Sequence, residues 1–554
     1  MVICLVTLFN AGRPSEALAA RHGVVATVHP LASQAAVEAF QAGGNAVDAA
    51  VVAALTLGVV DGHNSGIGGG CFMVIRLADG RVVAIDGRET APAAATRDMY
   101  LRDGKADPQL SQLGPLAIAV PGAIAAYEEA VCKHGKLPLS RHLEAAARLA
   151  EQGFPLTLTS ARQIAAAQKY LVQFPASRAV YLDRDGKLFA AGALFVQPDL
   201  AKTYHALARE GADWFYRGEF AKATATWMKA NGGLIAEQDF ADYRIKLREP
   251  LRTTYRGYEI IGMSPPSSGG VHVAQILNIL EQFDLKALGH NSADMIHVVT
   301  EAMKLAFADR AWWLGDPDFA PVPRGLMSRE YAAELAKKID PKHATPVPNH
   351  GMPPRADEDV FGKHTTHFST ADSEGNWVAC TATINTTFGS KVVIPGTGVV
   401  MNNQMDDFSA QPGVPNAFGL LGNAANAVAP GKRPLSSMSP TIVLKDGKAV
   451  FSVGAAGGPT IISQTVLALI QFIDFGLPPV QALKQPRFHH QWRPDQLKIE
   501  SSVGRPVLQE LERLGHKLAP VASLGAAQAV AFLPEQGGFV GAADPRGEGK
   551  AAVW

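Results

Sequence analysis

A single threonine stands at the junction between a proline-rich segment and a strand-like pattern. Five prolines and mixed charges fill residues 340–364, and strand-forming residues begin at Thr365. A threonine hydroxyl is a weak nucleophile unless a base lies beside it. If the chain is cut before Thr365, the freed α-amine, with a pKa of about 7.7–8.0, becomes that base. Taken alone, Thr365-Thr366 is interpreted more simply as a pair of strand-forming residues.

The residues after Thr365 predict a β-hairpin that brings further polar groups to it. Two strand-like runs flank the three-residue loop 373–375, whose last residue is a glycine. That glycine suits the left-handed conformation that such loops need. Opposite positions in an antiparallel pair have a constant sum, so Thr365 falls opposite Thr383, with Asn385 on the same face. A slip of one residue would remove this alignment.

A pair of glycines could supply donors for negative charge. Gly457 and Gly458 precede Pro459 and a helical pattern. Proline suits the first helical position, and the amides before it are free to point at a developing oxyanion. A plain glycine-rich turn between strand and helix is the alternative. This pair does not meet the dinucleotide-binding pattern. The cluster at 66–70 does not meet it either, because Cys71 stands where the pattern requires its last glycine.

The elements that must position these groups show a change of pattern along the chain. Asn45 is expected to cap a helix over 46–57, with Asp48 at a position that suits the helix dipole. The other expected elements are helices over 33–41 and 140–152, a mainly helical stretch over 121–339, an irregular exposed linker over 340–363, hairpin strands over 71–77 and 82–86, and strands over 392–393, 398–401, 441–444 and 449–453. Helices first and strands later indicate an α+β fold built in layers.

Composition excludes several classes of protein. The 554 residues include 51 Lys and Arg and 51 Asp and Glu, and this balance argues against nucleic acid as the main partner. A hydrophobic content of 47% excludes dominant disorder. No segment reaches the ~20 apolar residues of a membrane span. The pairs His489-His490 and His364/His367 lack a third ligand at sensible spacing, so no metal is expected.

The N-terminus predicts an export signal. An apolar run at 2–9 is followed by Ala17-Leu18-Ala19, which resembles a signal-peptidase site. We therefore expect residues 1–20 to be a secretory signal peptide and the protein to be periplasmic or secreted. An ordinary N-terminal strand is the alternative interpretation.

Several longer motifs resemble the γ-glutamyltranspeptidase family. They follow the family's order from about residue 22 to the C-terminus: GGNAVDA at 43–49, the glycine cluster at 66–70, DGRE at 86–89, PPSSGG at 265–270, HTTHFS at 364–369, TINTTFG at 383–389, NNQMDDF at 402–408 and RPLSSMSPT at 433–441. Taken together, these motifs are highly specific.

The resemblance implies a fold and a life history. The family has the N-terminal-nucleophile hydrolase fold, a four-layer αββα sandwich formed by two chains cut from one precursor. Cleavage would fall between His364 and Thr365, giving a large subunit of residues 21–364 and a small subunit of residues 365–554 that stay together. The linker over 340–364 would carry the new C-terminus away from the site.

The resemblance also implies an activity and its residues. Thr365 would attack the γ-carbonyl of glutathione or another γ-glutamyl compound and form an ester. Water then gives glutamate, while an amino acid or dipeptide gives transfer, and no cofactor is needed. The implied roles are orientation of Thr365 by Thr383, oxyanion donation by Gly457 and Gly458, binding of the substrate carboxylate by Arg88, Ser436 and Ser437, and binding of its ammonium by Asp407, Asn385 and Gln404.

Phe418 departs from the family pattern, as does Pro459-Thr460 after Gly458, and two other functions remain open. Phe418 stands where many bacterial members have a tyrosine in a lid, here about 415–432, so its missing hydroxyl cannot bond Asn385. We expect a looser lid and more hydrolysis relative to transfer. A related acylase, such as a cephalosporin acylase, would keep the nucleophile but leave Arg88 and Asp407 unpaired. A secreted binding protein with an inactive site would show no self-cleavage.

Overall fold

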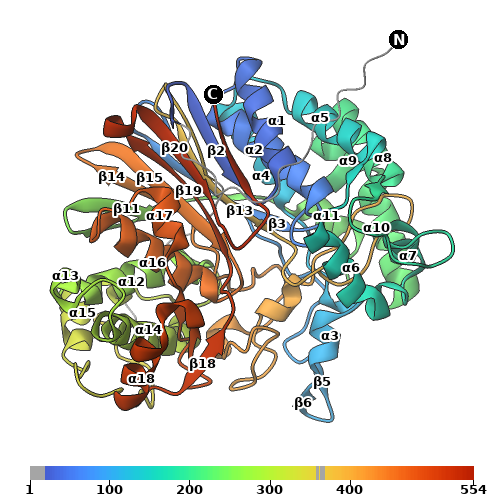
Figure 1. Cartoon of the computed structure of the whole chain (residues 1–554). Helices are drawn as coiled ribbons and strands as arrows, with labels where there is room; N and C mark the ends of the chain where they lie inside the picture. Colours follow the sequence, from blue (N-terminus) through green and yellow to red (C-terminus); the bar gives the residue numbers. More distant parts are fainter. Residues whose placement is uncertain (1–18, 357–360, 362–368) are drawn as a thin grey trace.

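Two antiparallel seven-stranded sheets form the centre of the computed structural model (Figure 1), which describes residues 19–356, 361 and 369–554. Sheet I has the order β1 (Ala19–Ala20), β20 (Gly538–Ala543), β19 (Ala526–Leu533), β15 (Lys448–Ala456), β14 (Thr441–Lys445), β11 (Tyr258–Gly262) and β10 (Leu251–Tyr255). Sheet II has the order β21 (Lys550–Val553), β2 (Gly23–Thr27), β12 (Ser369–Asp372), β13 (Trp377–Thr383), β3 (Gly70–Arg76), β4 (Val82–Gly87) and β9 (Lys246–Arg248). Most of the expected signal peptide, together with His364 and Thr365, lies outside the described residues.

The two sheets pack against each other through alternate side chains of their strands. A buried apolar cluster joins Val24 and Ala379 of sheet II to Ile442 and Val530 of sheet I. Successive side chains of a strand point to opposite faces, so each sheet also has an outer apolar face that must be covered. Both faces of each sheet are therefore part of the core.

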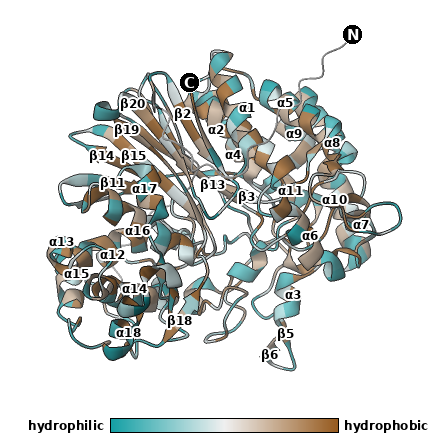
Figure 2. Cartoon of the chain, in the orientation of Figure 1, coloured by the Kyte–Doolittle hydropathy of each residue, from teal (hydrophilic) through white to brown (hydrophobic). Residues whose placement is uncertain are grey.

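Helices cover those outer faces (Figure 1). Sheet II packs on α1 (Pro30–Gln41), α2 (Ala46–Val60) and α4 (Ala123–His134), and α5 (Leu139–Gln152) packs on α2 and α4. Sheet I packs on α12 (Ser268–Leu280) and α16 (Thr460–Ile473), and α14 (Ala293–Trp313) packs on α12. Hydrophobic colour marks the central strands in Figure 2. The helices of sheet II come from the first third of the chain, and those of sheet I come from its middle and end.

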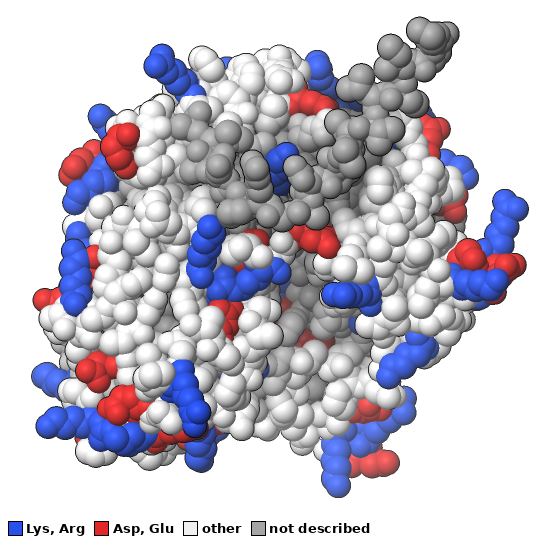
Figure 3. All heavy atoms as spheres, in the orientation of Figure 1, with Lys and Arg blue, Asp and Glu red and all other residues white. Residues whose placement is uncertain are grey.

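The other elements are shorter or lie at the periphery. They are α3 (Pro108–Gln112), α6 (Leu158–Leu171), α7 (Pro175–Tyr181), α8 (Pro198–Glu210), α9 (Ala212–Tyr216), α10 (Glu219–Asn231), α11 (Glu237–Asp242), α13 (Leu285–Leu288), α15 (Arg329–Ala336), α17 (Pro479–Lys484), α18 (Arg505–Arg513), β5 (Leu101–Arg102), β6 (Lys105–Ala106), β7 (Phe154–Pro155), β8 (Leu194–Phe195), β16 (Phe488–His489), β17 (Leu497–Glu500) and β18 (Leu518–Val521). Among the described residues, none of the helices combines the length and apolar character needed to cross a membrane. Basic and acidic side chains are interspersed on the face drawn in Figure 3.

The predicted start of α2 is confirmed. The Asn45 side chain accepts hydrogen bonds from the amides of Val47 and Asp48, and the Asp48 side chain accepts one from the Asn45 amide. This reciprocal capping satisfies donors that the first helical turn leaves free. Asp372, at the end of β12, also accepts a bond from the Ala46 amide at 2.8 Å. The start of α2 is therefore tied to the hairpin of sheet II.

The predicted hairpin is confirmed in its described part. Thr370 pairs with Val378 and Ala371 with Trp377, which is the expected constant sum. Gly375 has the left-handed conformation that the loop needs, with φ of +99°. Thr365, which we expect opposite Thr383, lies outside the described residues.

The structure corrects the expectation for two regions and agrees with it for a third. The stretch over 121–339 contains β9, β10 and β11 as well as helices, because β11 finds its partner β14 far along the chain. The strands expected at 392–393 and 398–401 are reduced to one bridge between Val393 and Val400, since Gly396 and Gly398 turn the chain with positive φ. The described linker residues 340–356 contain no helix or strand, as expected.

Candidate active site

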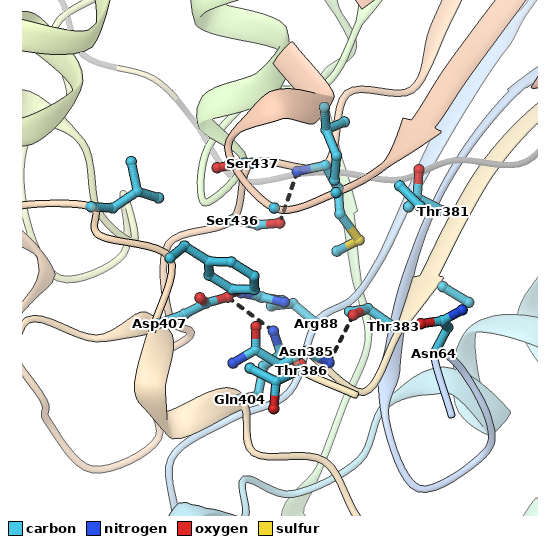
Figure 4. A pocket seen from close by; sticks show the side chains of 18 of the residues that line it. Asn64, Arg88, Thr381, Thr383, Asn385, Thr386, Gln404, Asp407, Ser436 and Ser437 are labelled. Atoms are coloured by element: carbon cyan, nitrogen blue, oxygen red, sulfur yellow. Dashed lines mark hydrogen bonds and ion pairs between the residues drawn. The ribbon is translucent and has the colours of Figure 1, made fainter. Parts of the chain in front are cut away.

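A pocket of about 310 Å³ collects every described residue that the sequence singled out for chemistry. The contributors come from the ends of strands and from loops of both halves of the chain (Figure 4). They are Arg88 after β4, Thr383 at the end of β13, Asn385 in the loop that follows β13, Gln404 and Asp407 at the two ends of a short 3₁₀ helix, Ser436 and Ser437 before β14, and Gly457 and Gly458 between β15 and α16. His364 and Thr365 lie outside the described residues.

Arg88, Ser436 and Ser437 form what we call the cationic wall of this pocket. The Arg88 side chain is fully buried, and its Nε and Nη2 donate to the carbonyl oxygens of Pro434 and Leu435 at 3.1 and 3.2 Å. These bonds hold the guanidinium against the segment that carries the two serines. Within the described chain, Arg88 Nη1 has no hydrogen-bond partner.

The two serine hydroxyls of the cationic wall are arranged as donors. Ser436 Oγ accepts the Met438 amide at 3.1 Å, and Ser437 Oγ accepts Arg310 Nη2 at 3.1 Å (Figure 4 shows the former). Neither hydroxyl donates to an acceptor in the part of the chain that is described. A serine hydroxyl has one proton to give, so both protons are available to an acceptor in the pocket.

Asp407, Gln404 and Asn385 form the opposite, anionic wall. Asp407 Oδ2 accepts Arg88 Nη2 at 2.5 Å and Gln404 Nε2 at 2.9 Å. Gln404 Oε1 is buried and has no donor among the described residues. Asn385 adopts φ of +79° and donates Nδ2 to the Asn403 carbonyl. This wall therefore offers acceptors next to the donors of the cationic wall.

Thr383 is held at the edge of the pocket by its neighbours. Its hydroxyl oxygen accepts the Asn385 amide at 2.8 Å (Figure 4). A Cβ on Gly69 would come within 2.0 Å of the Thr383 carbonyl oxygen, and one on Gly68 would clash equally with the Val400 carbonyl. The glycine cluster at 66–70 thus allows backbone to approach backbone beneath the site.

The Gly457-Gly458 pair presents free amides to the pocket. Both residues have positive φ, +135° and +58°. Their carbonyls accept bonds from Thr460 and Ile461 at the start of α16, while neither amide donates to another described residue. Pro459 is the cap and Thr460 the first helical residue, one position later than the sequence predicts. Free amides at a helix start are suited to an oxyanion.

Phe418 lies against this glycine pair. A Cβ on Gly458 would fall 2.6 Å from the Phe418 ring, so the ring covers that side of the pocket. The backbone around it is anchored, because Asp406 accepts the Ala417 amide and Gln491 donates to the Phe418 carbonyl. The Asn385 side chain makes its bond to Asn403 without any hydroxyl from Phe418.

Glu89 places a titratable group behind the cationic wall. Its side chain is fully buried, and burial raises the pKa of the Glu89 carboxyl to about 7 against the opposing charge of Arg88. Arg88 Nη1 lies 3.6 Å from Glu89 Oε2. A Cβ on Gly70 would fall 2.5 Å from the same oxygen, so glycine is needed there.

Sequence reasoning missed part of the lining. The additional residues are Asn64, Thr381, Ala382, Thr386, Thr387, Leu420, Met438, Ala456 and Ile461. Most are immediate neighbours of motif residues, and that adjacency is a signal that could have found them. Asn64 is held beside the pocket by a bond to a distant part of the chain, because its carbonyl oxygen accepts the Ile384 amide.

A cluster of His297, Glu301 and His516 has the donor types of a metal site. Its polar atoms already have partners, however. Lys304 Nζ donates to Glu301 at 2.8 Å, and the two imidazoles bond each other at 2.7 Å. The Lys304 ammonium supplies the positive charge that this carboxylate needs. His489 is likewise a satisfied core histidine, bonded to Ser463 and Gln491.

Comparisons with known proteins agree over nearly the whole chain. Residues 32–554 match the family model described as gamma-glutamyltranspeptidase. The "Glutathione hydrolase proenzyme" of Escherichia coli (strain K12) is 44% identical over 530 residues, 95% of this chain and 91% of that protein. The "Acylase ACY 1 proenzyme" of Pseudomonas sp. (strain SE83) is 41% identical over 95% of this chain and 92% of that protein.

Solved structures agree with this. The crystal structure of cephalosporin acylase from Bacillus halodurans superposes with a TM-score of 0.86 at 30% identity, covering 100% of this chain and 99% of that one. The mixed α+β fold predicted from the sequence is therefore confirmed. Because the family model and these relatives span almost the full length, the chain belongs to the γ-glutamyltranspeptidase family.

Proposed function

We propose that this protein is a γ-glutamyltransferase and glutathione hydrolase that cleaves γ-glutamyl amide bonds. The observation that carries the proposal is the pairing of the two walls. Donors of Arg88, Ser436 and Ser437 face acceptors of Asp407 and Gln404 across one pocket. A γ-glutamyl group carries an α-carboxylate and an α-ammonium on one carbon, so it matches both walls at once.

The mechanism follows from the register of the hairpin. The constant sum of the described pairs of β12 and β13 supports the expectation that Thr365, which lies outside the described residues, falls opposite Thr383. The Thr365 hydroxyl attacks the γ-carbonyl, and its own α-amine takes the proton. The amides of Gly457 and Gly458 stabilise the oxyanion. The C–N bond then breaks, the leaving amine takes the proton, and a γ-glutamyl ester of Thr365 remains.

The ester is resolved by a second nucleophile. Water adds to the same carbonyl and releases glutamate, whereas an acceptor amino acid or dipeptide amine gives a new γ-glutamyl amide. In both cases the α-amine of Thr365 accepts the proton of the incoming group and returns it to the threonine oxygen. The reaction is balanced without any added cofactor.

Processing is part of the same proposal. Attack by the Thr365 hydroxyl on the carbonyl carbon of His364 would break the peptide C–N bond and leave an ester, with the proton passing to the freed amine. Hydrolysis of that ester by water would yield residues 21–364 and 365–554 as a heterodimer, with residues 1–20 removed on export to the periplasm or beyond the cell. The two facing sheets with helices outside would then be the four-layer αββα sandwich of N-terminal-nucleophile hydrolases, shared between two chains. The irregular described linker over 340–356 supports this, since a new C-terminus must leave the site.

An acylase specificity is the second candidate, favoured by the similarity to the acylase ACY 1 proenzyme. A substrate without an α-ammonium would leave Gln404 Oε1, which has no donor among the described residues, without a partner. Unpaired buried polar groups cost about 1–3 kcal/mol each. The anionic wall therefore favours the γ-glutamyl group.

The first experiment is the denatured mass of the purified protein with N-terminal sequencing of each chain. Cleavage at the proposed bond gives chains of roughly 36–38 kDa and about 20 kDa by residue count, the smaller beginning at Thr365. Thr365→Ala is the control and should remain one chain. An intact, inactive wild-type chain would instead support a binding protein.

Substrate choice is tested with two anilides. Hydrolysis of γ-glutamyl-p-nitroanilide should exceed that of glutaryl-p-nitroanilide, which lacks only the α-ammonium. Processed protein that prefers the glutaryl compound would be an acylase, and the proposed activity would be wrong.

A further inference from the structure

Arg310, on α14, is a buried cation without an acidic partner. Arg310 is 4% exposed, and no carboxylate lies within ion-pair distance of it among the described residues. A charged side chain in the interior is normally paired. The other buried arginines follow that rule: Arg88 pairs with Asp407, Arg248 and Arg433 with Asp86, and Arg487 with Asp544.

Arg310 contacts the cationic wall directly from behind. Its Nη2 donates to Ser437 Oγ at 3.1 Å, and its Nε donates to Ser268 Oγ at 2.9 Å. Ser268, at the start of α12, links Arg310 to Ser436, because its hydroxyl and its amide both donate to the Ser436 carbonyl at 2.7 Å. One guanidinium therefore supports both serines of the pocket.

The chemistry of the guanidinium sets the direction of these bonds. An arginine side chain only donates, so Ser437 must receive the Arg310 hydrogen on its oxygen. Its own proton then has no acceptor among the described residues and is free to bond a group held in the pocket that Ser437 lines. Ser437 is thereby fixed as a donor to a bound anion.

The charge of Arg310 also differs from that of Arg88. Asp407, at 2.5 Å, offsets Arg88 before any substrate arrives. Burial lowers the pKa of Arg310 to about 10, while the Asp407 charge opposes that fall, so Arg310 remains protonated at neutral pH. It adds a positive charge behind the serines that has no ion-pair partner among the described residues.

We infer that Arg310 is a positioning residue that makes the site specific for donors with an α-carboxylate, by holding the Ser437 hydroxyl as a donor and supplying the unpaired positive charge behind it. The inference rests on the proposed γ-glutamyl specificity. A donor without that carboxylate would leave the Ser437 proton without an acceptor and the Arg310 charge without a nearby negative charge.

The test compares three anilides in wild type and Arg310→Met: γ-glutamyl, glutaryl, which lacks the ammonium, and 4-aminobutyryl, which lacks the carboxylate. Arg310→Met should lower kcat/KM for the two carboxylate-bearing donors about tenfold or more, mainly through KM. The 4-aminobutyryl value should stay within about twofold. An equal loss on all three, or no loss, would overturn the inference.

A second measurement covers donors that turn over too slowly. The inhibition constants of glutamate and glutarate should rise in Arg310→Met, and that of 4-aminobutyrate should not. Adding Ser437→Ala completes a double-mutant cycle. If Arg310 acts through Ser437, the Arg310 effect shrinks in the Ser437→Ala background, whereas full additivity would contradict the inference.

The control is Arg546→Met. Arg546 is a mostly buried arginine paired with Glu500 and Asp544, away from the pocket residues. It should lose stability without any change in the ratio between the three anilides. If Arg310→Met is not processed to a chain starting at Thr365, Arg310→Lys and Ser268→Ala provide the same comparison. Failure of the proposed function is separate, since wild type itself would then not cleave the γ-glutamyl anilide.

Discussion

The two walls of the pocket are built in different ways. The cationic wall is fully buried at Arg88 and is supported from behind by Ser268 and Arg310, which belong to two core helices. The anionic wall rests on a single 3₁₀ turn and a loop, and its Asp407 side chain is 12% exposed. The cationic wall therefore shares more of its contacts with the core helices than the anionic wall does.

This difference shows where each wall obtains its charge balance. A buried guanidinium needs a nearby anion, and Arg88 finds it in the adjoining Asp407. Asp407 therefore has two tasks, to neutralise Arg88 and to receive the substrate ammonium. The walls are separate in construction but coupled through this one ion pair.

Breaking the coupling should have the largest effect. Asp407→Asn keeps the shape but leaves the Arg88 charge uncompensated, and removing one partner of a buried pair costs about 3–5 kcal/mol. We expect kcat/KM for γ-glutamyl-p-nitroanilide to fall by about 10²–10³-fold, with a smaller loss for the glutaryl anilide, which has no ammonium. Steady-state kinetics on both substrates measure this.

The matched control for that variant is Asp474→Asn. Asp474 pairs with Arg256 and Tyr255 in another part of the fold. It should lower the melting temperature and leave the kinetics of processed enzyme unchanged. Equal losses on the two anilides in Asp407→Asn would mean that the walls do not recognise the two charges separately.

Changing Glu89 should sharpen the comparison through pH. The pKa of Glu89 is raised to about 7, so the carboxyl ionises as pH rises through neutrality and then competes with the substrate carboxylate for Arg88. The KM for the donor should rise about threefold or more from pH 6 to 8.5. Glu89→Gln should remove that rise and leave any pH dependence of kcat, which would come from the Thr365 amine.

The pH dependence of stability is a second test of the raised pKa of Glu89. A carboxyl whose folded pKa lies above its ordinary value of 4.5 binds its proton more tightly in the folded protein. Its contribution is present below about pH 4.5 and is lost as pH rises to about 7. Melting temperatures of wild type should therefore fall over that range relative to Glu89→Gln, and parallel curves would contradict the assignment.

The smallest effect is expected at the edge of the anionic wall. Phe418→Tyr adds a hydroxyl beside the pocket that Asn385 also lines, and one neutral hydrogen bond is worth about 1 kcal/mol. A lid held in this way should raise the ratio of transfer to hydrolysis by about twofold to fivefold. Product analysis with a dipeptide acceptor measures the ratio, and Phe418→Leu serves as a control without a hydroxyl. An unchanged ratio in Phe418→Tyr would exclude Phe418 as the cause of a hydrolytic preference.

Sequence alone determined the features that depend on near neighbours. The turn at Gly375 and the register beyond it follow from local backbone conformation. The Asn45 cap follows from donors within one helical turn. The family motifs also contained the described residues of the two walls and Thr383, although not the whole lining of the pocket. Such features are predictable because the groups involved are few residues apart or occur in a recognisable order.

Only the tertiary structure decided which distant groups face each other. Arg88 meets Asp407 across 319 positions, and Arg310 meets Ser437 across 127. The sequence marked Arg88 and Asp407 as binders of two charges but did not show that they neutralise each other, and Arg310 carried no signal within its helix. The physical reason is that the cost of a buried charge depends on what packs around it, and that packing exists only once both sheets and their helices have assembled.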